Sequence, residues 1–301
     1  MHHPYLSEEK KQQYLAHLAT RAQAWPVPVE ERTVDTSWGA TFMRISGPVD
    51  APPLVLLPGG GTTSLMWTPM VAGLAAKYRV YALDSVMDLG RSVRSRDAKN
   101  ADDLCAWLAE VLQALGLGPE VRLMGMSHGG WLAANFATRF PERVKQLVLL
   151  APAAWVEDLP TSLIFRMLLM FLPPRRYWMR RIYRATLPDL AATAQGPALI
   201  DAMTEDLALA FECYPLRELG KTVPPLKASD EALRSLRVPT LFVVGEHERI
   251  YDPATAFARL ERVAPQVRRV LVRGAGHDLP WLKADEVNVR VLAFFDEPST
   301  H

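Results

Sequence analysis

The segment that most clearly indicates catalysis contains a serine flanked by glycines. GMSHG at 125–129 follows the apolar run 121–124 and leads directly into a helix-like stretch. In a strand–turn–helix setting of this kind, the serine occupies a strained turn that exposes its hydroxyl, and the glycines remove side chains that would clash there. The positive end of the following helix favours a developing oxyanion. The pattern therefore predicts a nucleophile at Ser127.

A nucleophilic serine needs a base, and His277 is the best candidate among the seven histidines. It lies in GAGHDLPW at 274–281, just after an apolar strand-like run. Loops at the carboxyl ends of parallel strands are where α/β sheets gather their active sites. His128 follows the serine on the turn itself, where its side chain is poorly placed to take the serine's proton. His247 is a weaker candidate because it adjoins the expected acid.

The base in turn needs a carboxylate that orients its ring and stabilises the imidazolium ion. The apolar run 241–245 leads into EHERIYDP at 246–253, which offers three carboxylates. Glu248 is the first choice as the acid, Asp252 is the alternative, and Glu246 is a weaker third. Each choice gives the chain order serine, acid, histidine, which is the order that this strand-to-helix turn uses.

An oxyanion hole requires two convergent backbone N–H groups. His128, the residue after the nucleophile, is expected to supply one, and PGGGTTS at 58–64 is expected to supply the other. Gly60 is the preferred donor in that loop, and Gly61 is the next. The glycine run lacks the lysine and spacing of a phosphate-binding P-loop. The zinc pattern that His247-Glu248 begins is incomplete because position 251 is tyrosine, so we expect no cofactor and no metal.

Strand-like and helix-like runs alternate over most of the chain. Such alternation predicts an α/β fold with a mostly parallel central sheet and helices on both faces. The strand-like runs are 54–57, 80–83, 121–124, 144–150, 241–244 and 267–272, and the helical patterns are 70–77, 102–115, 131–139 and 254–263.

The alternation breaks between residues 153 and 235, where the sequence is helical in pattern and shows no strand-like run. We expect this segment to be a helical cap, or lid, inserted between two strands of a core formed by residues 30–152 and 236–301. Residues 1–29 are expected to form an N-terminal helical extension. Its amphipathic helix at 7–24, with Ser7 as the N-cap, should pack on the outside of the core.

Taken together, these motifs resemble the α/β-hydrolase superfamily over nearly all of residues 30–296. The matching pieces stand in the family's order: LLPGGGT, RVYALDSVMDLGRS at 79–92, GMSHGG, RFPERVKQLVLLAP at 139–152, LFVVGEHERIYDP and GAGHDLPW. The resemblance implies a serine-nucleophile hydrolase, of the capped esterase or lipase kind, whose helical cap covers the pocket. Two positions depart from the family's pattern. Pro58 stands where a histidine often braces the oxyanion loop, and Glu248 stands where aspartate is usual.

The predicted activity is cleavage of carboxylic esters through a Ser-His-acid triad and an acyl-enzyme intermediate. One alternative keeps the fold and changes the reaction, because PGGGTTS resembles the oxyanion loop of hydrolases that cleave carbon–carbon bonds in vinylogous diketones. The other alternative is a ligand-binding homologue without turnover. The intact Ser127 and His277 argue against that binding role.

Composition narrows the range of partners. The 34 basic and 33 acidic residues give a net charge of +1, so charge gives no reason to expect nucleic acid as a partner. No apolar run approaches the roughly 18–20 residues of a membrane span. No secretory signal is readable at the N-terminus, and two cysteines cannot build a disulfide framework, so we expect a cytoplasmic protein with free buried thiols.

Within the expected cap, residues 163–184 hold six arginines and no acidic residue, interleaved with aromatic side chains. We expect the apolar face of this stretch to line a pocket for a small apolar ester while the arginines face water. Contact with nucleic acid or with an anionic membrane surface is the weaker alternative. The oligomeric state is left open.

Overall fold

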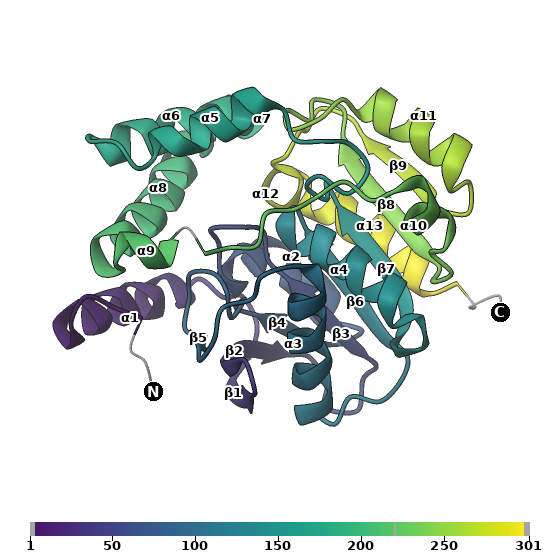
Figure 1. Ribbon diagram of the computed structural model, residues 1–301, viewed down its shortest axis with the longest axis horizontal. Helices are drawn as coiled ribbons and strands as arrows, with labels where there is room; N and C mark the ends of the chain where they lie inside the picture. Colours follow the sequence, from purple (N-terminus) through teal and green to yellow (C-terminus); the bar gives the residue numbers. More distant parts are fainter. Residues whose placement is uncertain (1–3, 220, 298–301) are drawn as a thin grey trace.

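A mixed sheet forms the centre of the protein, seen here in a computed structural model that describes residues 4–219 and 221–297. Within those residues the sheet has nine strands, in the order β1-β2-β4-β3-β6-β7-β8-β9, with β5 paired to β2 (Figure 1). The strands are β1 (Glu30–Thr36), β2 (Gly39–Ser46), β3 (Pro53–Leu57), β4 (Arg79–Leu83), β5 (Val93–Arg94), β6 (Val121–Met126), β7 (Val144–Leu150), β8 (Thr240–Gly245) and β9 (Arg268–Val272).

The six strands from β4 to β9 along this path are parallel and coincide with the six apolar runs predicted from the sequence. Their continuous apolar character follows from burial on both faces. In β3, for example, Val55 and Leu57 pack on one side of the sheet, while Leu54 and Leu56 pack on the other. The predicted α/β fold with a mostly parallel central sheet is confirmed.

Helices cover both faces of the sheet, as expected for parallel strands joined by crossover connections. One face carries α3 (Ala101–Ala114), α4 (His128–Arg139) and α11 (Pro253–Val263). The other carries α2 (Thr68–Ala75), α12 (Leu279–Leu282) and α13 (Ala284–Phe295). Short 3-10 turns at Ser64–Trp67 and Pro141–Arg143 lead into α2 and β7.

The antiparallel end of the sheet was not among the predicted strands. β1 reads EERTVDT and is mostly exposed, so it lacks the apolar run that marks the other strands. β2 pairs with both β1 and β4 and is buried, yet it contains Arg44. The guanidinium of Arg44 donates to Ser64 Oγ at 2.6 Å and lies 3.4 Å from Glu31. These polar contacts allow the charged Arg44 to be buried in β2. The charge also explains why the sequence pattern of β2 did not predict a strand.

Between β7 and β8 the chain forms helices that we call the cap helices. They are α5 (Thr161–Leu169), α6 (Arg175–Thr186), α7 (Pro188–Ala191), α8 (Gly196–Cys213) and α9 (Leu216–Leu219), and a further helix, α10 (Asp230–Arg234), packs beside α11. In Figure 1 the cap helices α5, α6 and α8 stand at the upper left, with α1 below them. The division of the chain into extension, core and cap stays a prediction.

The N-terminal helix α1 (Glu8–Ala22) begins at Ser7, whose side chain accepts a hydrogen bond from the Lys10 N–H group, as expected of an N-cap. We expected this helix on the outside of the core, but it packs against α8 of the cap instead. Its buried Tyr14 meets Tyr214 edge to face at 5.4 Å. The apolar stripe of α1 therefore covers the cap, because an amphipathic pattern predicts burial without naming the partner.

None of the helices in residues 4–219 and 221–297 combines the length and the hydrophobicity that crossing a bilayer requires.

Candidate active site

Ser127 lies in a strained turn between β6 and α4. Its φ of 52° and ψ of −118° fall in a region that costs a non-glycine residue about 1–3 kcal/mol. The turn is held by backbone hydrogen bonds on both sides. The Ser127 N–H group donates to Leu150 C=O at 3.0 Å, and the Ser127 carbonyl accepts from Trp131 at 2.9 Å and from Ala153 at 3.0 Å. This network fixes the serine at the carboxyl end of the sheet.

The glycines around the serine are required by close backbone approach. A Cβ atom at Gly125 would lie 2.3 Å from the Gly129 carbonyl oxygen. One at Gly129 would lie 2.3 Å from the Leu57 carbonyl oxygen. Real Cβ atoms do not come this close to backbone oxygens, so strand, turn and helix can meet here only without side chains.

His277 and Glu248 form a hydrogen-bonded pair at the same edge of the sheet. The distance between His277 Nδ1 and Glu248 Oε2 is 2.9 Å, and the carboxylate is fully buried. The other oxygen of Glu248 accepts from the backbone N–H groups of Arg249 at 2.7 Å and Ile250 at 3.0 Å. With both of its oxygens held in this way, Glu248 fixes the ring of His277 and leaves its Nε2 atom free to act on a substrate or a serine.

The other acidic candidates have different partners. Asp252 is the N-cap of α11, where its carboxylate accepts from the N–H groups of Ala254 and Thr255 and from the Thr255 hydroxyl at 2.6 Å. Those hydrogen bonds with Thr255 hold the pKa of Asp252 below its usual value. Glu246 accepts from the Gly274 N–H group. Neither carboxylate contacts His277, so among the three only Glu248 has the geometry of a triad acid.

The neighbours of His277 raise its pKa. Burial by itself would lower the pKa, since it disfavours the charged imidazolium. The charge of Glu248, the hydrogen bond with it and the charge of Asp278 outweigh burial, and the pKa of His277 is raised above its usual 6.5. The raised pKa makes His277 a stronger base. It also means that the ring becomes neutral, and able to accept a proton, only at a higher pH.

The glycine loop after β3 lies directly against the serine turn. A Cβ atom at Gly59 would be 3.6 Å from Ser127 Cβ, and one at Gly60 would be 3.5 Å from His128 Cβ. The Gly59 N–H group donates to Met66 Sδ, and the Gly61 N–H group donates to Asp88 Oδ2 at 2.8 Å. Across residues 4–219 and 221–297, no hydrogen-bond partner is found for the N–H group of Gly60 or of His128. These two groups therefore have the free donors that an oxyanion hole needs, whereas Gly61 is already engaged.

The side chain of His128 belongs to the structure around the turn. Its Nε2 atom lies 2.8 Å from the Val223 carbonyl oxygen, which can only accept, so Nε2 carries the proton. Burial lowers the pKa of this histidine. It therefore stays neutral, and its ring fixes the chain that returns from the cap. His247, the third candidate base, is exposed and pairs with Asp189 of α7 at 2.9 Å.

Two buried or half-buried aspartates were missed at the sequence level. Asp278 is fully buried and accepts from the Gly276 N–H group and from the Leu190 N–H group of the cap, both at 2.8 Å. Asp88 holds the glycine loop through Gly61. The signals were acidic residues inside otherwise apolar or glycine-rich loops, at HDLPW and VMDLG.

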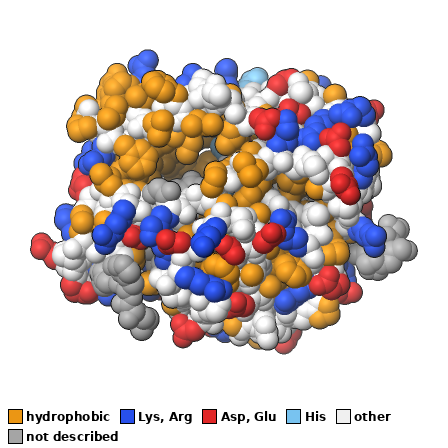
Figure 2. All heavy atoms as spheres, viewed as in Figure 1, with side chains coloured by type: hydrophobic (Ala, Val, Ile, Leu, Met, Phe, Trp, Pro, Cys, Tyr) orange, Lys and Arg blue, Asp and Glu red, His pale blue; other side chains and the backbone are white. Residues whose placement is uncertain are grey.

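A hollow lies between the cap helices and the core. Figure 2 shows it in the same view as Figure 1, surrounded by hydrophobic side chains. The cap contacts the glycine loop, because a Cβ atom at Gly61 would lie 3.8 Å from Leu207 Cδ1 of α8. On α5 no residue is buried, and Ile164, Phe165 and Leu168 are at least half exposed. On α6 two of the arginines are paired with α8, Arg176 with Glu205 and Glu212, and Arg180 with Asp201.

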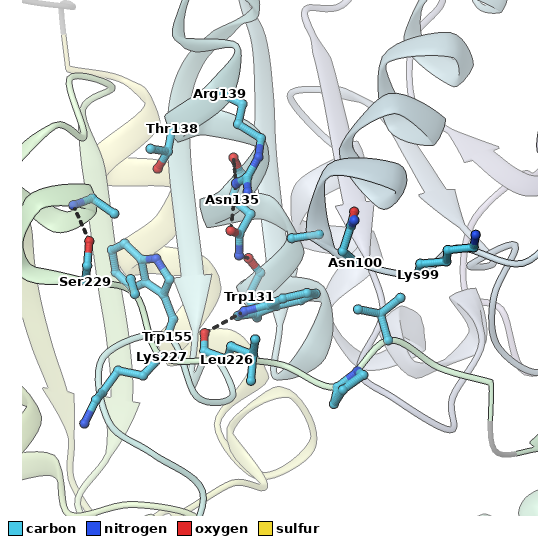
Figure 3. Close-up of a pocket in the computed structure, with 15 residues that line it drawn as sticks. Lys99, Asn100, Trp131, Asn135, Thr138, Arg139, Trp155, Leu226, Lys227 and Ser229 are labelled. Carbon is cyan, nitrogen blue, oxygen red and sulfur yellow. Dashed lines mark hydrogen bonds between the residues drawn. The ribbon is translucent and has the colours of Figure 1, made fainter.

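A cavity of about 330 Å³ lies beside α4, and none of the triad candidates lines it. Its walls come from one side of α4, from residues 99–101 at the start of α3, from Trp155 and from the chain segment 223–232 (Figure 3). In Figure 3 the indole N–H of Trp131 donates to Leu226 C=O, at 3.0 Å. This cavity has neither Ser127 nor His277 in its walls, so we do not assign the reaction to it. In the described part of the chain, no cluster of three or more His, Cys, Asp or Glu side chains could hold a metal ion.

Known proteins resemble this chain over most of its length. The sequence model of a protein family described as "alpha/beta hydrolase fold" matches residues 52–195. The Bacillus subtilis (strain 168) protein named uncharacterized carboxylesterase nap is 33% identical over 285 residues, which make up 90% of this chain and 88% of that protein. The chain belongs to the α/β-hydrolase family. Carboxylesterase YbfK from the same organism is 31% identical over 288 residues, 90% of this chain and 89% of that protein.

The solved structures agree with this membership of the α/β-hydrolase family. The crystal structure of naproxen esterase (carboxylesterase NP) from Bacillus subtilis has a TM-score of 0.86 and 30% sequence identity, and the match covers 97% of this chain and 100% of that chain. The family assignment made from the sequence motifs is confirmed.

Proposed function

We propose that this α/β-hydrolase cleaves carboxylic esters through an acyl-enzyme intermediate. The observation that carries the proposal is the 2.9 Å contact between His277 Nδ1 and Glu248 Oε2, at the same sheet edge as the strained turn of Ser127. The ester as the substrate is supported by two relatives, 33% and 31% identical, that are named carboxylesterases. The acid in this proposal is Glu248, and Asp252 has no part in it.

In the first half of the reaction, Ser127 Oγ attacks the ester carbonyl while His277 Nε2 takes the hydroxyl proton. Glu248 keeps the ring in the tautomer that leaves Nε2 unprotonated and stabilises the imidazolium that forms. The N–H groups of Gly60 and His128 donate to the oxyanion of the tetrahedral intermediate. Their free donors and the adjacent N-terminus of α4 support this assignment.

In the second half, His277 gives its proton to the leaving alcohol, and the intermediate collapses to the acyl-enzyme. The same ring then takes a proton from water, which attacks the acyl carbonyl and releases the acid. No cofactor or metal has a role in these steps. The apolar side chains around the hollow support a small ester with an apolar group.

A cytoplasmic location is part of the proposal. It is supported by the two buried thiols, Cys105 in the core and Cys213 in the cap, which form no disulfide with each other. Carbon–carbon bond cleavage is supported only by the resemblance of the PGGGTTS loop, whereas ester cleavage is also supported by two relatives named carboxylesterases.

Labelling with a fluorophosphonate probe tests the nucleophile directly. We expect one covalent adduct, found by peptide mass spectrometry on the peptide that contains Ser127, because only an activated serine attacks the phosphorus atom. Heat-denatured protein and the Ser127→Ala variant serve as controls and should stay unlabelled. A native protein that resists the probe, or an adduct on another serine, would rule the proposed nucleophile out and bring forward the ligand-binding alternative.

A further inference from the structure

Between Gly59 and Thr62 of the glycine loop after β3, three of the four N–H groups have a hydrogen-bond partner in the described part of the chain, and one has none. The Gly59 N–H group donates to Met66 Sδ at 3.1 Å, the Gly61 N–H group to Asp88 Oδ2 at 2.8 Å, and the Thr62 N–H group to Gly59 C=O at 3.3 Å. The free group is that of Gly60, the proposed oxyanion donor. Its direction therefore depends on how firmly its two neighbours are held.

Of these ties, the one to Asp88 is the only contact with a carboxylate. Gly61 has a φ of +70°, so the chain turns back on itself there and needs a partner that fixes the turn. The preceding Pro58 offers the loop no side-chain hydrogen bond. A thioether is a weak acceptor, whereas a carboxylate accepting from N–H forms one of the stronger hydrogen bonds in proteins. The position of the Gly60–Gly61 peptide is thus set chiefly by Asp88.

Asp88 is itself well anchored. Its N–H group donates to Ser85 C=O, and its other carboxylate oxygen accepts from the Leu89 N–H group at 2.8 Å. A Cβ atom at Gly60 would lie 3.9 Å from Asp88 Oδ2, so the carboxylate lies just behind the proposed donor. The side chain is half-buried beneath the cap, where Leu207 of α8 adjoins the same loop.

We propose that Asp88 is a positioning residue for ester hydrolysis, which holds the Gly60 N–H group in line with the oxyanion through its hydrogen bond to Gly61. The inference rests on the proposed function, since it requires an oxyanion at Ser127. Asp88 touches no reacting atom. It acts on the rate because a donor aligned with the intermediate stabilises the transition state more than the bound substrate.

The charge on Asp88 changes close to neutral pH. Burial raises the pKa of Asp88 to about 6, against the lowering effect of the Gly61 and Leu89 N–H groups, and the neighbouring Asp84 raises it further. Two tyrosines also face it, Tyr183 of α6 and Tyr14 of α1, and burial raises the pKa of both, so they stay neutral. Below pH 6, protonation weakens the acceptor for Gly61, so the loop should be held less firmly.

The test compares wild type with Asp88→Asn, using p-nitrophenyl butyrate as substrate and an alkyl trifluoromethyl ketone as oxyanion-forming inhibitor. We expect kcat to fall by about 10- to 100-fold, KM to stay within about twofold, and inhibitor affinity to fall by the same factor as kcat. We also expect log(kcat/KM) of wild type to fall with a slope approaching two over about the first pH unit below pH 6, as His277 and Asp88 both take protons, and with a slope of about one in the variant.

Asp252→Asn is the matched control, because that carboxylate also accepts from two backbone N–H groups but belongs to α11. It should leave kcat, inhibition and the slope unchanged. If Asp88→Asn does not fold, Asp88→Glu takes its place, and it should lose kcat and inhibition together while keeping the steeper slope. Unchanged kcat and inhibition in a folded variant would overturn the positioning role. A wild type that the ketone does not inhibit would instead overturn the proposed function.

Discussion

At the scale of single residues, the proposed reaction depends most on the protonation state of His277. A general base must be neutral to accept the proton of Ser127. Burial lowers the pKa of His277, but the charge of Glu248, the hydrogen bond with it and the charge of Asp278 together raise that pKa above 6.5. Activity is therefore lost as the pH falls through this raised pKa. We expect the acid limb of the kcat/KM profile to have its midpoint above pH 6.5.

The variant Glu248→Gln tests the His277–Glu248 pair by changing the carboxylate. The amide removes the charge that raises the pKa of His277, so burial should prevail and move the pKa below 6.5, as an NMR titration of the ring would report. We expect kcat to fall by about ten-thousand-fold, since the ring loses the partner that fixes its tautomer.

Asp252→Asn is the comparison for that loss. Asparagine caps a helix about as well as aspartate, so this replacement at the N-cap of α11 should cost less than about 0.5 kcal/mol of stability and leave kcat within about threefold. The reverse ranking of the two variants would transfer the role of the acid to Asp252.

On the scale of elements, the crossing of β6, its turn and α4 depends on glycines with no room for a methyl group. Gly125→Ala places a Cβ atom 2.3 Å from a backbone oxygen, so we expect the free energy of unfolding to fall by about 3 kcal/mol or more. Gly118→Ala is the control, since nothing lies within 4 Å of a Cβ there, and it should change stability by less than about 1 kcal/mol. Urea denaturation of both variants measures the difference, and equal stabilities would contradict the close packing.

The secondary-structure elements differ in how well the sequence predicts them. The parallel strands were predictable because burial on both faces leaves an uninterrupted apolar run, as in β7 and β8. β1 and β2 were not predicted because their pattern mixes charged residues with apolar ones. The partners that stabilise Arg44, namely Ser64 and Glu31 of β1, become its neighbours only in the fold. Ser127, His277 and Glu248 were found through motifs. Asp88 was not found, because its proposed role depends on a hydrogen bond with Gly61, which is 27 residues away in the sequence.

At the scale of the whole molecule, the cap joins parts of the chain that are distant in sequence. Helix α8 packs against α6 on one side and α1 on the other, and its Leu207 adjoins the glycine loop. The loop of His277 is tied to the cap as well, through Asp278 and Leu190. The loop that carries the base and the loop that carries the proposed Gly60 donor therefore both contact the cap, so the shape of the hollow between cap and core should govern which esters react.

The most direct measurement of the central claim is turnover of p-nitrophenyl esters, from acetate to decanoate, by wild type and Ser127→Ala side by side. We expect wild type to hydrolyse at least the shorter esters, and Ser127→Ala to lose about a million-fold in kcat while keeping the wild-type melting temperature. The profile over acyl chain length would then measure the hollow beneath the cap. Ester turnover that survives in the folded Ser127→Ala variant, or no turnover of any ester by wild type, would contradict the account.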